Sequence, residues 1–173
     1  ASLAFAMAVR DSGASNRIVR ALSGLHIPVG AATIVMTVVL WGWHVPALYD
    51  AALSNMLVYW AMQLSILATS FAFWHAVCRA GAVGAVGGLL GGMVQMGFLG
   101  ALLTFAARPF YLVHIVAAPS WGISALADQQ LSGLIMWVGG MAPFAIGAAV
   151  IARKAWLRQD DIMPVAGIVR NPA

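Results

Sequence analysis

Charged residues are scarce in this sequence. Only 8% of its 173 residues are charged, whereas 62% are hydrophobic. A soluble domain carries roughly 25% charged residues, because its surface must be solvated. Five acidic and nine basic side chains are too few to cover a globular domain of this length. The composition therefore excludes an ordinary soluble protein. It predicts one all-α integral membrane domain over residues 1–173, with lipid around it.

Cysteine and the motifs of common enzymes are also scarce. Cys78 is the single cysteine, so the chain cannot form an internal disulfide. The sequence has no phosphate-binding glycine loop that opens a helix, no H-E-x-x-H motif and no convincing nucleophile–base pair. With Asp50 the one acid in the segment after the first apolar run, few groups are available for acid–base catalysis. These absences predict a protein that is not an enzyme, and no nucleic acid is expected among its partners.

Long apolar runs predict a bundle of four spanning helices, since a helix needs about 20 apolar residues to cross a bilayer. The runs lie near residues 27–46, 56–78, 82–106 and 130–152. Proline and glycine interrupt residues 107–129, which we expect to be an outer loop with a short helix on the surface. Residues 153–173 are expected to be a cytoplasmic tail. The apolar residues 1–9 are too few to cross alone, and we interpret them as the end of an earlier helix or, less favoured, as an interfacial anchor.

The basic residues predict the orientation, because Lys and Arg gather on the cytoplasmic side of membrane proteins. With four spans, Arg108 is the one base on the outer side, and the other eight fall on the inner side: Arg10, Arg17, Arg20, Arg79, Arg153, Lys154, Arg158 and Arg170. Both ends of the chain are therefore expected to be cytoplasmic. Residues 41–50 and the 107–129 loop then lie on the same outer side, where they can meet.

Two histidines lie on that outer side, His44 and His114. Each is either an isolated, hydrogen-bonded ring at the interface or part of a copper(I) site, which takes imidazole together with thioether sulfur. Tryptophans such as Trp43 and Trp121 are ordinary at this depth. Arg108 and Asp128 bracket the outer loop, and we expect a salt bridge between them or with Asp50.

A row of glycines lies in the third apolar run at four-residue intervals, with Met96 completing the row between Gly92 and Gly100. Such a row lets another helix backbone approach closely. It fits internal packing of the bundle, which we favour, or contact with a separate subunit. The members of the row are Gly84, Gly88, Gly92 and Gly100.

Three segments resemble the CtaG family of cytochrome c oxidase assembly factors: "WHVPALYDAAL" (43–53), "LGALLTFAARPFY" (99–111) and "APSWGISALADQQLSGLIMW" (118–137). The resemblance runs from about residue 27 to residue 155. It implies a multi-span protein of the bacterial inner membrane whose partners are haem–copper oxidase subunits, and which handles copper or holds a subunit during maturation. It assigns an outer-face motif of Trp43, Pro46, Tyr49, Asp50, Arg108, Trp121, Asp128 and Gln129, with His44, Asp50 and His114 at matching positions.

The sequence also departs from this family. Members typically carry H-x-x-E-H on the helix after the Y-D motif, and here Tyr59, Met62 and Gln63 stand at those positions. Two interpretations follow from the resemblance. Met62 forms a softer copper site with His44, His114 and Met96, or the site is lost and the chain is a non-catalytic accessory subunit of a respiratory membrane complex. A small transporter is a weaker alternative, since the spans contain almost no ionisable residues.

Overall fold

The computed structural model describes residues 27–160, with side chains as far as Arg158. The expectations for residues 1–9 and for the last residues of the tail lie outside this part of the chain. All regular secondary structure between residues 27 and 160 is helical, which confirms the all-α prediction. Three of these helices are long and apolar enough to cross a membrane: α5 (Met56–Arg79), α6 (Ala82–Thr104) and α8 (Ala125–Asp160). A fourth crossing is counted if the bent pair α3 (Val29–Trp43) and α4 (Pro46–Ser54) is one span.

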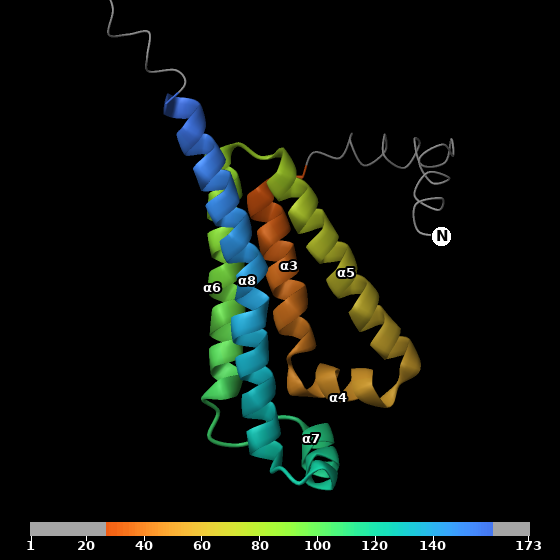
Figure 1. Ribbon diagram of the computed structural model, residues 1–173. Helices are drawn as coiled ribbons and strands as arrows, with labels where there is room; N and C mark the ends of the chain where they lie inside the picture. The colour runs from red at the N-terminus through yellow and green to blue at the C-terminus, as the bar shows by residue number, and fades with distance from the viewer. Residues whose placement is uncertain (1–26, 161–173) are drawn as a thin grey trace, which may run out of the picture.

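The first predicted span is not one straight helix. Helix α3 (Val29–Trp43) ends early, and α4 (Pro46–Ser54) leaves at an angle of 72°. The physical reason is Pro46 at the start of α4, because a proline ring disfavours helical backbone at the preceding residue. Val45 accordingly has extended backbone, with φ −64° and ψ 126°. Helix α4 therefore runs across one end of the bundle and joins α3 to α5 (Figure 1).

Helices α5 (Met56–Arg79) and α6 (Ala82–Thr104) lie close to the predicted spans. Asn55 fixes the start of α5, since its Oδ1 accepts hydrogen bonds from the backbone N–H groups of Leu57 at 2.9 Å and Val58 at 3.3 Å. Near the other end of α5, the aromatic ring of Phe73 is fully buried. Figure 1 shows α5 beside α3 at this end, while its first turns stand away from the bundle.

The last helix is longer than predicted. Helix α8 (Ala125–Asp160) begins five residues before the predicted span of residues 130–152 and continues through residues 153–160. Ser124 precedes the first turn, and its Oγ accepts a hydrogen bond from the N–H of Ala127 at 3.1 Å. The expected short helix within the 107–129 loop is present as α7 (Leu112–Ala117), continued by the 3₁₀ turn η1 (Ala118–Trp121).

The glycine row lies at helix contacts within the chain. A Cβ on Gly84 would lie 3.7 Å from a methyl carbon of Val29 on α3, and one on Gly88 only 2.6 Å from the other. Farther along α6 the partner is α8. A Cβ on Gly92 would lie 2.6 Å from the ring of Phe144, and one on Gly100 would lie 2.7 Å from Cβ of Trp137. Internal packing therefore accounts for Gly88, Gly92 and Gly100, whereas Gly84 is exposed and a Cβ there would make only an ordinary contact.

Candidate polar site at one end of the bundle

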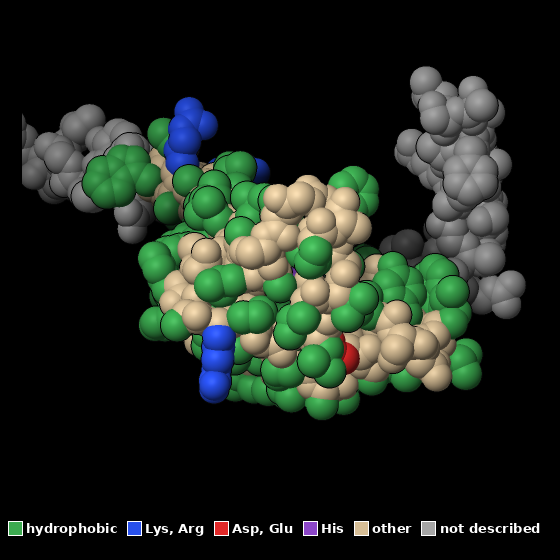
Figure 2. All heavy atoms as spheres, turned by 90° about the horizontal axis from the view of Figure 1, so that it is seen from below, with side chains coloured by type: hydrophobic (Ala, Val, Ile, Leu, Met, Phe, Trp, Pro, Cys, Tyr) green, Lys and Arg blue, Asp and Glu red, His purple; other side chains and the backbone are tan. Residues whose placement is uncertain are grey.

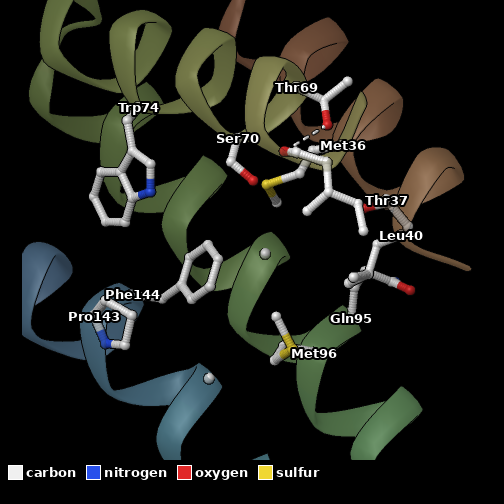
Figure 3. Close-up of a pocket in the computed structure, with 13 residues that line it drawn as sticks. Met36, Thr37, Leu40, Thr69, Ser70, Trp74, Gln95, Met96, Pro143 and Phe144 are labelled. Atoms are coloured by element: carbon white, nitrogen blue, oxygen red, sulfur yellow. Dashed lines mark hydrogen bonds between the residues drawn. The ribbon is translucent and has the colours of Figure 1, made fainter. Parts of the chain in front are cut away.

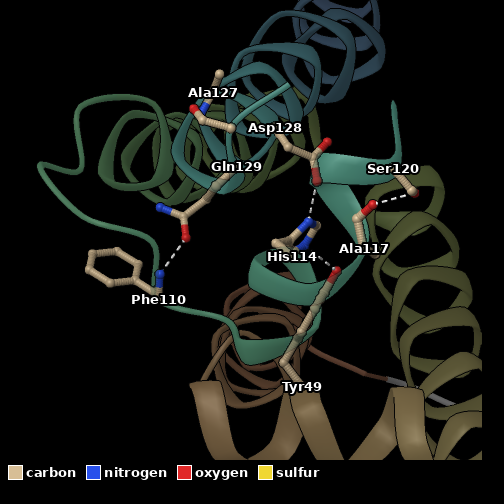
Figure 4. Close-up of polar contacts among 9 residues, drawn as sticks. Tyr49, Phe110, His114, Ala117, Ser120, Ala127, Asp128 and Gln129 are labelled. Atoms are coloured by element: carbon tan, nitrogen blue, oxygen red, sulfur yellow. Dashed lines mark hydrogen bonds and ion pairs between the residues drawn. The ribbon is translucent and has the colours of Figure 1, made fainter. Parts of the chain in front are cut away.

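A chain of three polar side chains joins α8, α7 and α4 (Figure 4). Asp128, in the first turn of α8, accepts a hydrogen bond from Nδ1 of His114 on α7. The other ring nitrogen of His114, Nε2, lies 3.3 Å from the hydroxyl of Tyr49 on α4. Nδ1 donates to the carboxylate; in the neutral imidazole Nε2 then accepts from the tyrosine hydroxyl, and in the imidazolium it donates to that hydroxyl. Both ring nitrogens of His114 are therefore engaged, and three elements are fixed relative to one another.

A second tyrosine links this chain to His44. The ring of Tyr111 lies against that of Tyr49, with 4.2 Å between centroids, and its hydroxyl donates to the backbone carbonyl of His44 at 3.0 Å. Nδ1 of His44 is 2.7 Å from the carbonyl oxygen of Leu40, to which it donates. Its Nε2 has no hydrogen-bond partner in the described part of the chain. We name His44, Tyr49, Asp50, Tyr111, His114 and Asp128 the polar cluster.

Two further side chains of the predicted motif hold the segment before α7. Oδ2 of Asp50 accepts from the backbone N–H of Leu112 at 3.4 Å. Gln129 is 1% exposed, and its Oε1 accepts from the N–H of Phe110 at 2.6 Å. One atom of each side chain, Oδ1 of Asp50 and Nε2 of Gln129, is buried without a partner among the described residues. The motif thus fastens the loop to α4 and α8.

Burial controls the protonation of the two tyrosines. It raises the pKa of Tyr111 from 10 to about 12, with smaller contributions from Tyr49 and Asp50. Burial, followed by the negative charges of Asp128 and Asp50, also raises the pKa of Tyr49 above its ordinary value. Both hydroxyls therefore remain protonated at neutral pH and act as hydrogen-bond donors.

The salt bridge expected for Arg108 is wrong. Asp128 pairs with His114, and Asp50 bonds to backbone, while Arg108 is exposed and forms no ion pair within the described residues. The reason is the position of α7, which packs against the start of α8 and places its histidine next to Asp128. Helix α7 was predicted, but its partner was not.

The structure does not place the candidate methionines in the polar cluster. Met96 packs against Gly140 and lines a cavity of about 260 Å³ between α3, α5, α6 and α8 (Figure 3). Met62 is half-buried on α5, and the neighbouring Gln63 donates to the hydroxyl of Tyr59 at 3.3 Å. Among residues 27–158, no three His, Cys, Asp or Glu side chains are arranged to hold a metal ion.

The remaining residues of the outer-face motif are Trp43, Pro46 and Trp121. The indole N–H of Trp43 donates to Oγ of Ser65 at 2.8 Å and so ties α3 to α5. Pro46 begins α4, and Trp121 is exposed at the end of η1. Tyr111 was not singled out from the sequence. It could have been noticed as a polar hydroxyl in an otherwise apolar segment, two residues after Pro109 and three before His114.

These features define a multi-pass helical membrane protein in which a cluster of polar side chains at one end joins a surface helix to the bundle. The family model described as cytochrome c oxidase caa3 assembly factor (Caa3_CtaG) matches residues 3–159. The chain belongs to this family, as the three quoted segments predicted. No curated protein and no solved structure matches the chain.

Proposed function

We propose that this chain holds a subunit of a haem–copper cytochrome c oxidase during maturation, and that the partner docks on α7 and η1. The observation that supports this most is an exposed apolar surface on these elements: Leu112 is 67%, Val116 81% and Trp121 83% exposed. Figure 2, which views this end of the molecule, shows many hydrophobic side chains among backbone and other side chains on this face, and few charges. Exposed apolar patches of this kind mark contact surfaces for proteins or membranes.

The polar cluster supports the docking role because its hydrogen bonds hold α7 in place. Helix α7 is only six residues long and is too short to be stable alone. The bonds from His114 to Asp128 and Tyr49 fix it to α8 and α4. A surface held in one arrangement before binding loses less conformational entropy when the partner arrives. The role is therefore one of non-catalytic binding, in the bacterial inner membrane, with this end on the outer side as the arginines predict.

In this proposal copper is only a cargo, which the resemblance to the family suggests. A copper(I) ion would need two or three imidazole or sulfur ligands together. His114 has both nitrogens engaged, which leaves Nε2 of His44, while Met62 and Met96 lie in other surroundings. The described residues do not fit a copper site of their own, and we assign no step to copper.

A permanent accessory subunit is the second candidate. Helix α5 exposes an apolar side chain at nearly every turn, for example Leu57, Leu64 and Leu67. Such a face is solvated by lipid, or it is covered by the helix of a stable neighbour in a mature complex. The two candidates therefore differ in the surface used and in the lifetime of the complex.

The deciding experiment is purification of the tagged chain from its native membrane, with and without copper starvation to stop oxidase maturation. A holding factor is recovered with an immature oxidase subunit under starvation and is nearly absent from the mature enzyme. Replacing Val116 by Ser and Trp121 by Ser should lower that recovery about tenfold, as expected when the centre of an apolar contact is lost. Val83→Ser is the control for a lost exposed valine, because Val83 is 89% exposed but lies at the start of α6.

Other outcomes contradict the holding role. Stoichiometric presence in the mature oxidase, unaffected by the Val116 and Trp121 changes, would identify an accessory subunit. Copper bound to the free chain and lost with His44→Ala and His114→Ala would restore the copper hypothesis.

A further inference from the structure

The end of the bundle opposite the polar cluster has a groove between three helices. Its walls come from the end of α5, the start of α6 and the last turns of α8, and its volume is about 320 Å³. This is within the size range of small-molecule sites. Most of the lining is small and apolar, with Ala82 and Ala85 on one side and Ile151 and Ala155 on the other.

Two cations line the same groove. Lys154 and Arg158 are four residues apart on α8, so they lie on one face of the helix and both border the groove. No acidic side chain among the described residues forms an ion pair with either of them. Arg153, the neighbour of Lys154, is exposed and lies outside the lining. The positive charge is therefore directed to the groove by the register of α8.

The side chains around the groove are of the kinds that favour the depth of lipid headgroups. Trp156, between the two cations in sequence, is 68% exposed, and tryptophan in a spanning helix favours the membrane interface. Long basic side chains extend their charged ends toward the same layer. Helix α6 begins in the groove at Ala82, and no side chain caps its first turn. Its free N–H groups add to the positive potential there.

We propose that this groove binds one anionic phospholipid. Its phosphate lies between Lys154 and Arg158, and an acyl chain runs against the alanines of α6 and α8. Charge complementarity selects an anionic lipid over a zwitterionic one, because paired basic residues at a membrane surface attract net negative headgroups. The apolar walls select a lipid over a free phosphate ion, which would leave them in water.

The test is native mass spectrometry of the purified full chain, delipidated in detergent and titrated with dioleoyl-phosphatidylglycerol or dioleoyl-phosphatidylcholine. We expect one phosphatidylglycerol molecule to bind about tenfold more tightly than phosphatidylcholine. The double variant Lys154→Gln, Arg158→Gln should lose this preference. Arg153→Gln, which removes an adjacent charge outside the groove, should keep it.

A second pair of variants tests the groove itself without changing charge. Ala155→Leu fills the lining and should weaken binding of phosphatidylglycerol about tenfold, whereas Ala152→Leu, an exposed position on the preceding turn, should not. The helical signal in circular dichroism establishes that each variant is folded. Equal loss with Arg153→Gln, or no loss with Ala155→Leu, would overturn the proposal in favour of general attraction between basic residues and anionic lipid.

Discussion

The contact between α6 and α8 and the attachment of α4 and α7 are made by different means. Helices α6 and α8 pack through glycines: Gly100 lies against Trp137 and Gly133, and Gly140 lies against Met96. At the α4–α7 end, short elements are joined by side-chain hydrogen bonds within the polar cluster. The first contact depends on shape, since neighbouring backbones come close only where side chains are absent. The second depends on paired polar groups.

This difference shows how one apolar chain separates its scaffold from its binding surface. Close backbone packing in the membrane needs no polar group, so it is insensitive to pH and sensitive to added volume. A polar cluster at the interface fixes a surface helix that has few apolar contacts of its own. Variants should therefore disturb one region without the other.

The largest effect is expected at Gly100. A Cβ at this position would lie 2.7 Å from Cβ of Trp137, 2.9 Å from its Cα and 3.1 Å from the carbonyl oxygen of Gly133. Two of these atoms are backbone, so relaxation must separate the helices. Gly100→Leu should lower the free energy of unfolding by about 3 kcal/mol, measured by detergent denaturation followed by circular dichroism.

Gly87→Leu is the control on the same helix, because no atom lies within 4 Å of a Cβ built there. It should change the free energy of unfolding by about 0.5 kcal/mol or less. Equal losses at the two positions would show that α6 and α8 are not held by close glycine contact.

A smaller and more local effect is expected at Asp128. Asp128→Asn removes the charge that accepts from His114, and a hydrogen bond to a charged group contributes about 2 kcal/mol. A double-mutant cycle with His114→Gln should give a coupling energy of about 1 kcal/mol or more. Hydrogen exchange should accelerate in α7 and stay unchanged in α6. Additive losses, or faster exchange in α6, would contradict the separation of the two regions.

The sequence predicted the scaffold better than the polar cluster. The bounds of α5 and α6 followed from apolar runs that end at clear breaks, Asn55 and Gly81. Two further signals were present but were not used: Pro46, which predicts the break between α3 and α4, and Ser124, which caps α8. Helix ends depend on local chemistry, so these features were within reach of the sequence.

The pairing of side chains within the polar cluster could not be predicted from the sequence. His114 meets Asp128 fourteen residues away and Tyr49 sixty-five residues away. The pairing requires α4 to turn across the end of the bundle and α7 to fold back under α8. A pattern of hydrophobic periodicity carries no such information. The sequence therefore identified His44, His114, Asp50 and Asp128 as candidates, but it suggested the wrong partner for Asp128.

The smallest effect at neutral pH is expected at Tyr111, whose hydroxyl makes one bond, to the carbonyl of His44. Tyr111→Phe should cost about 1 kcal/mol at pH 7. At alkaline pH the wild type should lose stability. The unfolded phenol ionises near pH 10, whereas the folded one, 3% exposed, keeps its proton until about 12. Between these values the folded state binds more protons, so its stability falls as pH rises.

Tyr111→Phe should remove part of that alkaline loss, and Tyr59→Phe, on α5 outside the cluster, should retain it. The measurement is the midpoint of detergent denaturation at pH 8, 10 and 11.5 for the three proteins. An unchanged alkaline loss in Tyr111→Phe would mean that other groups cause it. A reduced loss, together with faster hydrogen exchange in α7 alone, would place the pH sensitivity of stability at the α4–α7 end, where polar side chains provide the attachment. The same result would exclude the α6–α8 contact as its source.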